Sequence, residues 1–394
     1  MTETIFVSIP TMNDSEYLNT LEKLFDQAKH PDRIFVGTTI FWKQSDVIDG
    51  KKPFFISFIN TIKKYYKNVK VDVLPWEAYA GVGFGRTEPL KHFNNEKYYL
   101  SLDSHTHFVA DWDEKIIDSY KKSKKHFGSK RILTTYLPPY FPDGELLIKS
   151  YPDKYTKDFT NTVLDDKYDN CFLKETLFSK WQFFDYYGHI SLTKDVITSK
   201  NIFPIPNDID LKVDRDSEVF KNIIEDEFLP AKKISAHFTF TEADPWVTSY
   251  RICLDPEIQF WAEEFYQSCL SYARGYNLVW IKTPIFFHQY SNGKEENFSR
   301  KIKNEDLEDF LNEAERTDVY KNYLLKIDNY KHNIQTPGGR ISENDIIKKL
   351  FNKKTFFGYL PRSMNAYIQY AGIDIYNQKC SPWWEVPKLN VIYK

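Results

Sequence analysis

Long apolar segments and paired cysteines are both missing from this sequence of 394 residues. No run approaches the roughly eighteen apolar residues that a membrane-spanning helix needs. The first residues, MTETIFVSIPTMND, carry no basic leader typical of a secretory signal. The four cysteines show no Cys-x-x-Cys spacing, which argues against a disulfide framework or a zinc knuckle. We therefore expect a cytoplasmic protein without a membrane span.

Charge of one sign and well-known catalytic motifs are scarce as well. The net charge is −2, and no Lys/Arg stripe extends beyond short runs such as residues 121–125, so we expect no nucleic-acid partner. The sequence has no G-x-S-x-G, Walker A or H-E-x-x-H motif. What it does have is 42% hydrophobic and 17% aromatic residues, enough for a large folded core. The length favours one large domain with an appendage, or two domains.

Short apolar runs alternate with helix-like segments along the first third of the chain. The runs typical of buried strands are residues 4–10, 33–41, 69–75, 98–103 and 131–138. Residues 15–28 and 53–67 lie between successive runs and carry apolar side chains at helical spacing, with Asp14 and Ser15 as candidate caps of the first helix. This alternation predicts an α/β fold with a parallel sheet and right-handed crossovers.

The later chain is less regular. Residues 138–175 are rich in Pro, Asp and Tyr, which predicts a long loop of the kind that often binds a ligand or partner. We call this segment the excursion. Order returns at residues 234–243, at a helix over 256–275 closed by Gly275, and at the apolar stretch 276–291. A polar link then precedes a mainly helical tail.

Polar residues stand where two predicted strands end. Ligands of open parallel sheets bind beyond the carboxyl ends of the strands, which is where Pro10, Thr11, Asp103, Ser104 and His105 fall. Asp103 and His105 are two residues apart on extended chain, so their side chains can converge on one ion. A carboxylate with an imidazole suits Mn²⁺ or a similar divalent ion. The alternative is an ordinary turn in which Asp103 caps the next segment.

Four other residues are weaker candidates. His288 also follows an apolar run and can supply a third metal ligand, although a structural histidine is the alternative. Arg86 follows three glycines in residues 78–86, so it can reach a phosphate or simply lie in a helix start. Glu263 and Glu264 are adjacent in a predicted helix, about 100° apart, so at most one faces a cleft squarely.

Three stretches, taken in order, resemble one family. They are YYLSLDSHTHFVADWD (98–113), AEEFYQSCLSYARGYNLVWIKTPIFFHQY (262–290) and FGYLPRSMNAYIQYAGIDI (357–375). The sequence is similar to the glycosyltransferases related to the cytosolic polypeptide α-N-acetylglucosaminyltransferase that modifies hydroxyproline. Two positions depart from the family's pattern, because His107 stands where we expect Arg and Ala262 where we expect Gly.

The resemblance implies a GT-A fold with a mixed and mostly parallel sheet, which we expect over residues 1–295. Aromatic and aliphatic residues at helical spacing in the tail predict a helical C-terminal extension over 300–394, packed on that domain. The resemblance also implies a retaining transferase that uses a UDP-sugar and Mn²⁺ or Mg²⁺. By resemblance Asp103 and His105 form the metal motif and His288 is the distal ligand. Arg86 is then a donor contact, and Glu263 and Glu264 are the acidic pair near sugar and acceptor. Position at the carboxyl edge of the sheet adds Pro10, Thr11, Asp103 and Ser104 to the predicted donor-binding residues.

The resulting hypothesis is transfer of GlcNAc or a related hexose to a hydroxyl on a protein or glycan. A metal-dependent phosphohydrolase that cleaves nucleotide sugars would use similar ligands. A non-catalytic sugar-binding module on the same fold is the third reading. The products released from a UDP-sugar separate the three.

Overall fold

A computed structural model describes most of the first 135 residues and several later segments. The residues described are 3–12, 14, 16–42, 64–65, 67–75, 82–135, 137, 175–184, 190–198, 202–203, 227–247, 263–281, 285–289, 362–371, 373–374 and 379–380. The predicted helix over 53–67 and the excursion over 138–175 lie almost wholly outside these residues, as does most of the predicted extension over 300–394.

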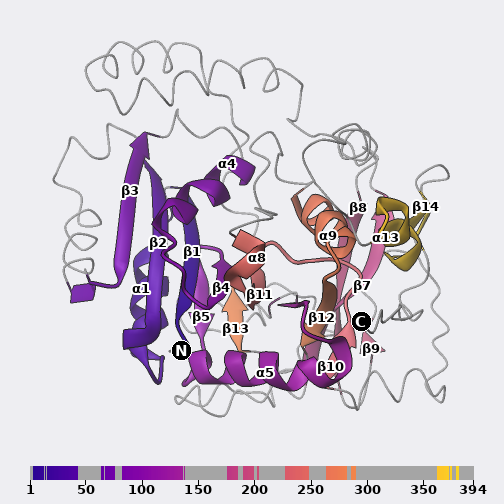
Figure 1. The fold of residues 1–394 in the computed structure, drawn as a ribbon, viewed down its shortest axis with the longest axis horizontal. Helices are drawn as coiled ribbons and strands as arrows, with labels where there is room; N and C mark the ends of the chain where they lie inside the picture. The colour runs from indigo at the N-terminus through magenta and orange to yellow at the C-terminus, as the bar shows by residue number, and fades with distance from the viewer. Residues whose placement is uncertain are drawn as a thin grey trace, which may run out of the picture.

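Figure 1 shows the arrangement of the described strands and helices. The elements are β1 (Ile5–Met12), α1 (Tyr17–Asp26), η1 (Pro31–Arg33), β2 (Ile34–Trp42), β3 (Val69–Pro75), α4 (Val82–Thr87), η3 (Glu88–His92), β4 (Tyr98–Leu102), β5 (Thr106–Phe108), α5 (Trp112–Phe127), β6 (Arg131–Thr134), β7 (Glu175–Phe184), β8 (Ile190–Thr198), β9 (Ile202–Phe203), β10 (Phe228–Pro230), β11 (Phe238–Glu242), α8 (Ala243–Pro245), α9 (Glu263–Ala273), β12 (Asn277–Ile281), β13 (Phe286–His288), α13 (Met364–Ala371), β14 (Ile373–Asp374) and β15 (Lys379–Cys380). Here η1 and η3 are 3₁₀-helices.

The main sheet has eight strands in the order β10-β12-β6-β11-β4-β1-β2-β3. The neighbours β3, β2, β1 and β4 are parallel, as are β6 and β12. Strand β11 runs antiparallel between β4 and β6, and β10 is antiparallel at the edge. This is the α/β arrangement with a mixed, mostly parallel sheet that we expected of a GT-A fold. The parallel arrangement that the strand-helix alternation predicted is confirmed for β1, β2, β3 and β4.

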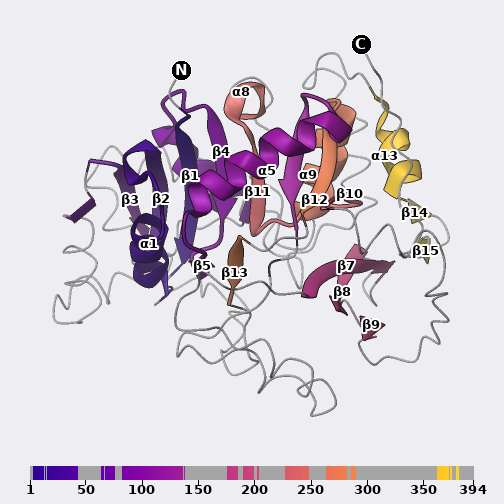
Figure 2. The ribbon, with the colours of Figure 1, turned by 90° about the horizontal axis from the view of Figure 1, so that it is seen from below.

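The central strands are buried along their whole length. Every residue of β4, β6 and β12 is buried, as expected for strands inside an α/β sheet. Helix α5 crosses the strands (Figure 2) and is joined to α1 by a hydrogen bond of 2.8 Å from Trp112 Nε1 to the Leu24 carbonyl. The resulting core holds the carboxyl end of β4 in place.

Several local predictions need adjustment. Strand β6 ends at Thr134 and β11 begins only at Phe238. The stretch 276–291 forms two strands in different sheets, because β12 joins the main sheet while β13 pairs with β5. The predicted end of the 256–275 helix is confirmed, since α9 stops at Ala273 and Gly275 has a φ of 93°.

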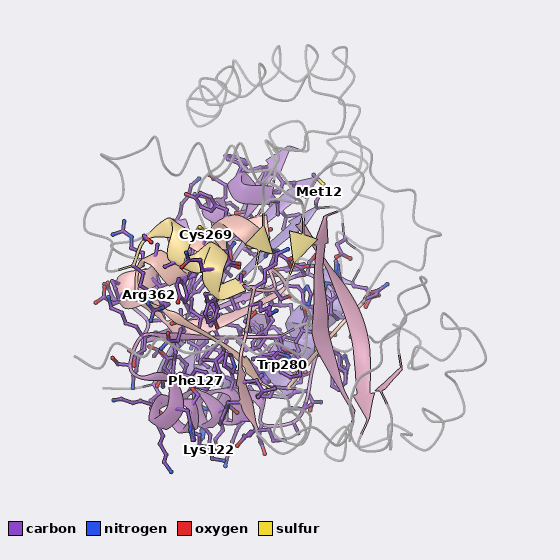
Figure 3. The ribbon with its side chains drawn as sticks, turned by 90° about the vertical axis from the view of Figure 1, so that its right-hand side faces the viewer. Met12, Lys122, Phe127, Cys269, Trp280 and Arg362 are labelled. Atoms are coloured by element: carbon purple, nitrogen blue, oxygen red, sulfur yellow. The ribbon has the colours of Figure 1, made fainter. Side chains whose placement is uncertain are left out.

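The last described helix, α13, lies against α9. The rings of Tyr272 and Tyr370 stack with centroids 4.5 Å apart, and the Tyr370 hydroxyl donates a hydrogen bond of 2.9 Å to the Ala231 carbonyl. Arg362, labelled in Figure 3, donates to the Tyr276 carbonyl at 2.9 Å. The predicted boundary at 295–300 lies outside the described residues. Among the described helices, none has the length and apolar character needed to cross a membrane.

Candidate metal and donor site

A short loop at the end of β4 carries the candidate metal ligands. The buried run of β4 stops at Leu102, and three residues separate it from the start of β5 at Thr106. Strand β5 pairs antiparallel with β13, with His288 opposite Thr106. The backbone N–H of Gln289 also donates to the His105 carbonyl at 3.0 Å. This pairing brings His288 beside the loop from the far part of the chain.

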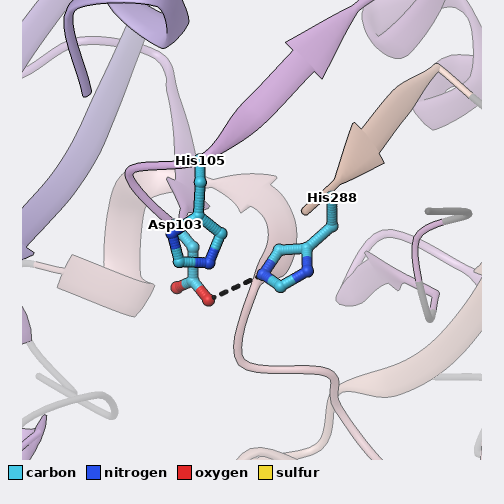
Figure 4. Close-up of side chains that lie close together, drawn as sticks. All are labelled: Asp103, His105 and His288. Carbon is cyan, nitrogen blue, oxygen red and sulfur yellow. Dashed lines mark hydrogen bonds and ion pairs between the residues drawn. The ribbon is translucent and has the colours of Figure 1, made fainter. Parts of the chain in front are cut away.

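Asp103, His105 and His288 converge (Figure 4). His288 Nε2 lies 3.1 Å from Asp103 Oδ2, and the two imidazole rings have centroids 4.6 Å apart. One ligand atom from each residue can be chosen so that all three lie within 4.8 Å of one another. The structure therefore brings together the three residues that the sequence suggested as metal ligands.

The donor set fits a divalent ion. One carboxylate and two imidazoles suit Mn²⁺ and related ions that also bind water or phosphate oxygens. Adjacent ligands on an octahedral ion with bonds of about 2.1 Å lie about 3 Å apart. The separation of 3.1 Å between Asp103 Oδ2 and His288 Nε2 agrees with that geometry.

Arg86 keeps Asp103 ionised. The Arg86 Nη2 atom donates to Asp103 Oδ1 at 2.8 Å, and Nη1 donates to Ser101 Oγ at 3.3 Å. Burial opposes the charge on Asp103, but Arg86 and then His288 outweigh it and hold the pKa of this carboxyl well below its usual range. Asp103 therefore carries a negative charge, as a metal ligand requires.

Arg86 also contacts Glu263. Arg86 lies in α4, Glu263 is the first residue of α9, and both are buried. The Arg86 Nε atom forms an ion pair with Glu263 Oε1, and Gln267 Nε2 donates to the same oxygen at 3.0 Å. Burial raises the pKa of Glu263 to about 7, against the opposing effect of Arg86. Arg86 thus lies between two carboxylates of the protein itself.

Glu264 points to different partners, as expected for adjacent helical residues. Its Oε2 lies 3.1 Å from Lys233 Nζ, and its Oε1 accepts a hydrogen bond of 3.0 Å from the Ala236 N–H. The two glutamates therefore contact separate groups, and only Glu263 is linked through Arg86 to Asp103.

The remaining predicted donor residues lie at the same sheet edge. Pro10 and Thr11 are near the carboxyl end of β1, which is the parallel neighbour of β4. Thr11 is buried. Ser104 is buried in the loop after β4, and its hydroxyl donates a hydrogen bond of 2.5 Å to Asp14 Oδ2.

Two residues near the ligands, Asp14 and His237, had no such place in the sequence interpretation, whereas His107 was expected on the same face as Asp103 and His105. Asp14 Oδ2 lies 2.6 Å from His105 Nδ1, although we expected Asp14 to cap a helix. His237 has its ring centroid 4.5 Å from that of His288 and accepts a hydrogen bond from the Leu137 N–H. His107 is buried in β5, and burial, aided by Lys23, lowers its pKa to about 4. The sequence held one signal for the position of Asp14, because this acid lies two residues beyond β1, the strand adjacent to β4.

Solved structures similar to this chain are distant. S. aureus TarS 1-349 has 12% sequence identity and a TM-score of 0.39, with 73% of this chain and 60% of that chain covered. GalNAc-T7 with UDP, GalNAc and Mn²⁺ has 13% identity, a TM-score of 0.43, and coverage of 73% and 44%. The mannosyltransferase PcManGT from Pyrobaculum calidifontis, in complex with GDP-Man and Mn²⁺, has 10% identity, a TM-score of 0.37, and coverage of 71% and 54%. Likenesses of this size assign neither activity nor ligand to this chain, which spans less than two thirds of each of them.

A comparison with curated proteins gives no match. A family model, by contrast, matches nearly the whole chain. The model is described as Glycosyltransferase (GlcNAc), and it matches residues 4–54 and 57–377. The matched range includes the loop after β4, the acidic helix α9 and the distal His288. The chain therefore belongs to the Glycosyltransferase (GlcNAc) family.

Proposed function

We propose that this protein is a metal-dependent glycosyltransferase that moves GlcNAc or a related hexose from a UDP-sugar to a hydroxyl on a protein or glycan. The observation that carries the proposal is the convergence of Asp103, His105 and His288 at the carboxyl edge of the sheet, in a chain that belongs to a glycosyltransferase family. That edge is where open α/β sheets bind nucleotides. The UDP donor and the kinship with enzymes that modify hydroxyproline rest on the sequence resemblance, which also supports a cytoplasmic location.

Each residue at the site has a proposed task. Asp103, His105 and His288 hold the ion, and Arg86 keeps Asp103 charged. When bound, Mn²⁺ or Mg²⁺ supplies a Lewis acid for the negative charge that grows on the departing diphosphate. Pro10, Thr11 and Ser104 line the same edge, beside the place proposed for the nucleotide.

We further propose that Glu263 and Glu264 act near the sugar and the acceptor, with retention of configuration. The anomeric carbon becomes oxocarbenium-like as its bond to phosphate breaks, so a nearby carboxylate stabilises it or orients the sugar hydroxyls. The chain of contacts from Glu263 through Arg86 to Asp103 supports a position next to the ion. Nuclear magnetic resonance of the isolated product tests retention through the anomeric configuration.

The central test is product analysis. The protein is incubated with UDP-GlcNAc, UDP-glucose or UDP-galactose, with Mn²⁺ and a lysate of the source cells. The proposal expects UDP as the nucleotide product and a sugar-labelled polypeptide or glycopeptide in mass spectrometry. The Asp103→Ala variant, analysed in parallel, is expected to release neither.

Other products would favour the other readings. Release of UMP and sugar 1-phosphate indicates the phosphohydrolase. Binding of a donor without turnover indicates a sugar-binding module. UDP release with label only on small free sugars or lipids contradicts the proposed acceptor but keeps the transferase.

The domain division is likewise a proposal, with residues 1–295 as the transferase domain and a helical extension over 300–394 packed on it. The contacts of α13 with α9 and with the segment after β10 support the packing. Limited proteolysis tests it, because a stable and fully active fragment ending near residue 300 would contradict it.

A further inference from the structure

Asp14 lies immediately behind one of the proposed ligands. It follows β1, and its Oδ2 atom lies 2.6 Å from His105 Nδ1, although the two residues are 91 positions apart. Two further hydrogen bonds fix the position of the Asp14 carboxylate. Ser104 Oγ donates to Oδ2 at 2.5 Å, and the Glu16 N–H donates to Oδ1 at 2.9 Å. The side chain is mostly shielded from solvent.

The contact to Nδ1 determines which ring nitrogen can bind a metal. A neutral imidazole has one N–H and one lone pair, and a carboxylate next to Nδ1 favours the proton there. The lone pair is then on Nε2. In this tautomer Asp14 Oδ2 accepts the hydrogen bond from Nδ1–H, over 2.6 Å.

We infer that Asp14 is a positioning residue for the metal site, holding His105 with Nδ1 protonated and Nε2 directed to the ion shared with Asp103 and His288. The inference rests on the proposed metal-dependent function. The inference adds a fourth side chain to the three proposed ligands. Asp14 does not contact the ion itself and acts through His105. Carboxylates in such positions typically change metal affinity by about 10- to 100-fold when they are removed.

The experiment measures Mn²⁺ binding to the full-length protein without any donor. Electron paramagnetic resonance of free Mn²⁺ gives the dissociation constant, and pulsed measurements on bound Mn²⁺ detect couplings to histidine nitrogen. The variants are Asp14→Asn, Asp14→Ala, Ser104→Ala, His105→Ala, Asp103→Ala and the double variant Asp14→Ala/His105→Ala. The control is Asp118→Asn, an exposed carboxylate on α5 that pairs only with Lys122 among the described ion pairs. Circular dichroism shows that each variant is folded.

We expect Asp14→Ala to weaken Mn²⁺ binding about 10- to 100-fold and to reduce the nitrogen couplings. Asp14→Asn is expected to act in the same direction with a smaller change, and Ser104→Ala to weaken binding by about two- to tenfold. Because Asp14 acts through His105, the double variant should bind no more weakly than His105→Ala alone. Asp118→Asn should match the wild type. If Asp14→Ala does not fold, Asp14→Asn and Ser104→Ala provide the same comparison.

The inference is overturned if the Asp14 variants keep the wild-type affinity and nitrogen couplings, or if their effect adds fully to that of His105→Ala. Those outcomes leave the proposed function standing as long as His105→Ala and Asp103→Ala lose Mn²⁺. If these ligand variants bind Mn²⁺ like the wild type, the metal site of the proposed function has failed, and the inference fails with it.

Discussion

Asp103 and Asp113 each pair with an arginine, but their surroundings differ. Asp113, at the start of α5, has a side chain that is 0% exposed. Its oxygens accept hydrogen bonds from the backbone N–H groups of Lys29 and His30 and from Arg33 Nε, at 2.8, 3.1 and 2.8 Å. Asp103 has a side chain that is 26% exposed, with Arg86 at one oxygen and a histidine at the other.

The difference separates a structural carboxylate from one that can act on a ligand. Donors from the protein surround Asp113, so its charge fixes the loop before β2 to α5. Asp103 is held ionised by Arg86, yet part of it remains accessible, and its other neighbours are groups that also bind metals. The presence of an arginine therefore does not distinguish the two sites, whereas the completeness of the surrounding donors does.

The largest expected effect comes from Asp103→Ala. Loss of the anionic ligand should lower the rate of sugar transfer by about a thousandfold or more. The midpoint of thermal unfolding should change little, because this carboxylate is partly open to solvent. Turnover of UDP-GlcNAc and a melting curve, measured on the same preparation, test both expectations. If Asp103→Ala kept the wild-type turnover in metal-limited buffer, Asp103 would not be a ligand of the ion.

Asp113→Ala should show the reverse pattern. Removing one partner of a buried ion pair leaves Arg33 and two backbone N–H groups without their acceptor, at a cost of roughly 3 kcal/mol in the free energy of unfolding. Denaturant unfolding measures this cost. The fraction that remains folded should bind Mn²⁺ with the wild-type dissociation constant. A weakened affinity would mean that Asp113 also shapes the metal site.

Addition of metal sharpens the same contrast. A ligand at a hundredfold excess over its dissociation constant stabilises the folded state by about 2.7 kcal/mol. Mn²⁺ should therefore raise the unfolding temperature of the wild type, and a chelator should reverse the change. Asp113→Asn should keep this response, while Asp103→Ala and His288→Ala should lose it. An equal rise in all four proteins would indicate binding elsewhere.

Glu263 extends the comparison to a third carboxylate, buried like Asp113 but bonded to the arginine that serves Asp103. Its pKa is raised from 4.5 to about 7, so the folded protein holds this proton more tightly than the unfolded chain does. The resulting stabilisation is complete below pH 4.5 and is lost as the pH rises through 7. The unfolding free energy of wild type minus that of Glu263→Gln should therefore fall over this range, by roughly 3 kcal/mol. The opposite slope would show that Arg86 keeps Glu263 ionised.

Sequence patterns predicted the strands better than their pairing. The apolar runs at 4–10, 33–41, 69–75 and 98–103 correspond to β1, β2, β3 and β4. Burial on both faces favours continuous apolar residues in the inner strands, whereas the edge strand β3 alternates apolar and polar residues. The antiparallel direction of β11 has no local signature, since its buried residues fit either direction. The same holds for the separation of β13 from β12, which depends on a partner strand far away in sequence.

The same distinction, between local patterns and contacts with distant residues, applies to the candidate site. Asp103, His105 and His288 were predictable because each follows an apolar run and has the chemistry of a metal ligand. The residues that contact these three side chains, and so set their charge and orientation, could not be predicted in the same way. The predicted contact of Arg86 with a phosphate stays a prediction, and its ion pairs with Asp103 and Glu263 were not foreseen. Asp14 was expected to cap α1, but that helix begins at Tyr17 and the Asp14 carboxylate contacts Ser104 and His105.

The pairing of β5 with β13 has a consequence for the order of events during synthesis. Asp103 and His105 leave the ribosome long before His288, which is 185 residues beyond Asp103. A nascent chain that has folded its first four strands holds only two of the three ligands, and the third arrives when β13 closes against β5. Tight binding at the proposed metal site therefore requires that the second half of the sheet has been made, so an ion bound there would selectively stabilise chains that have completed this pairing.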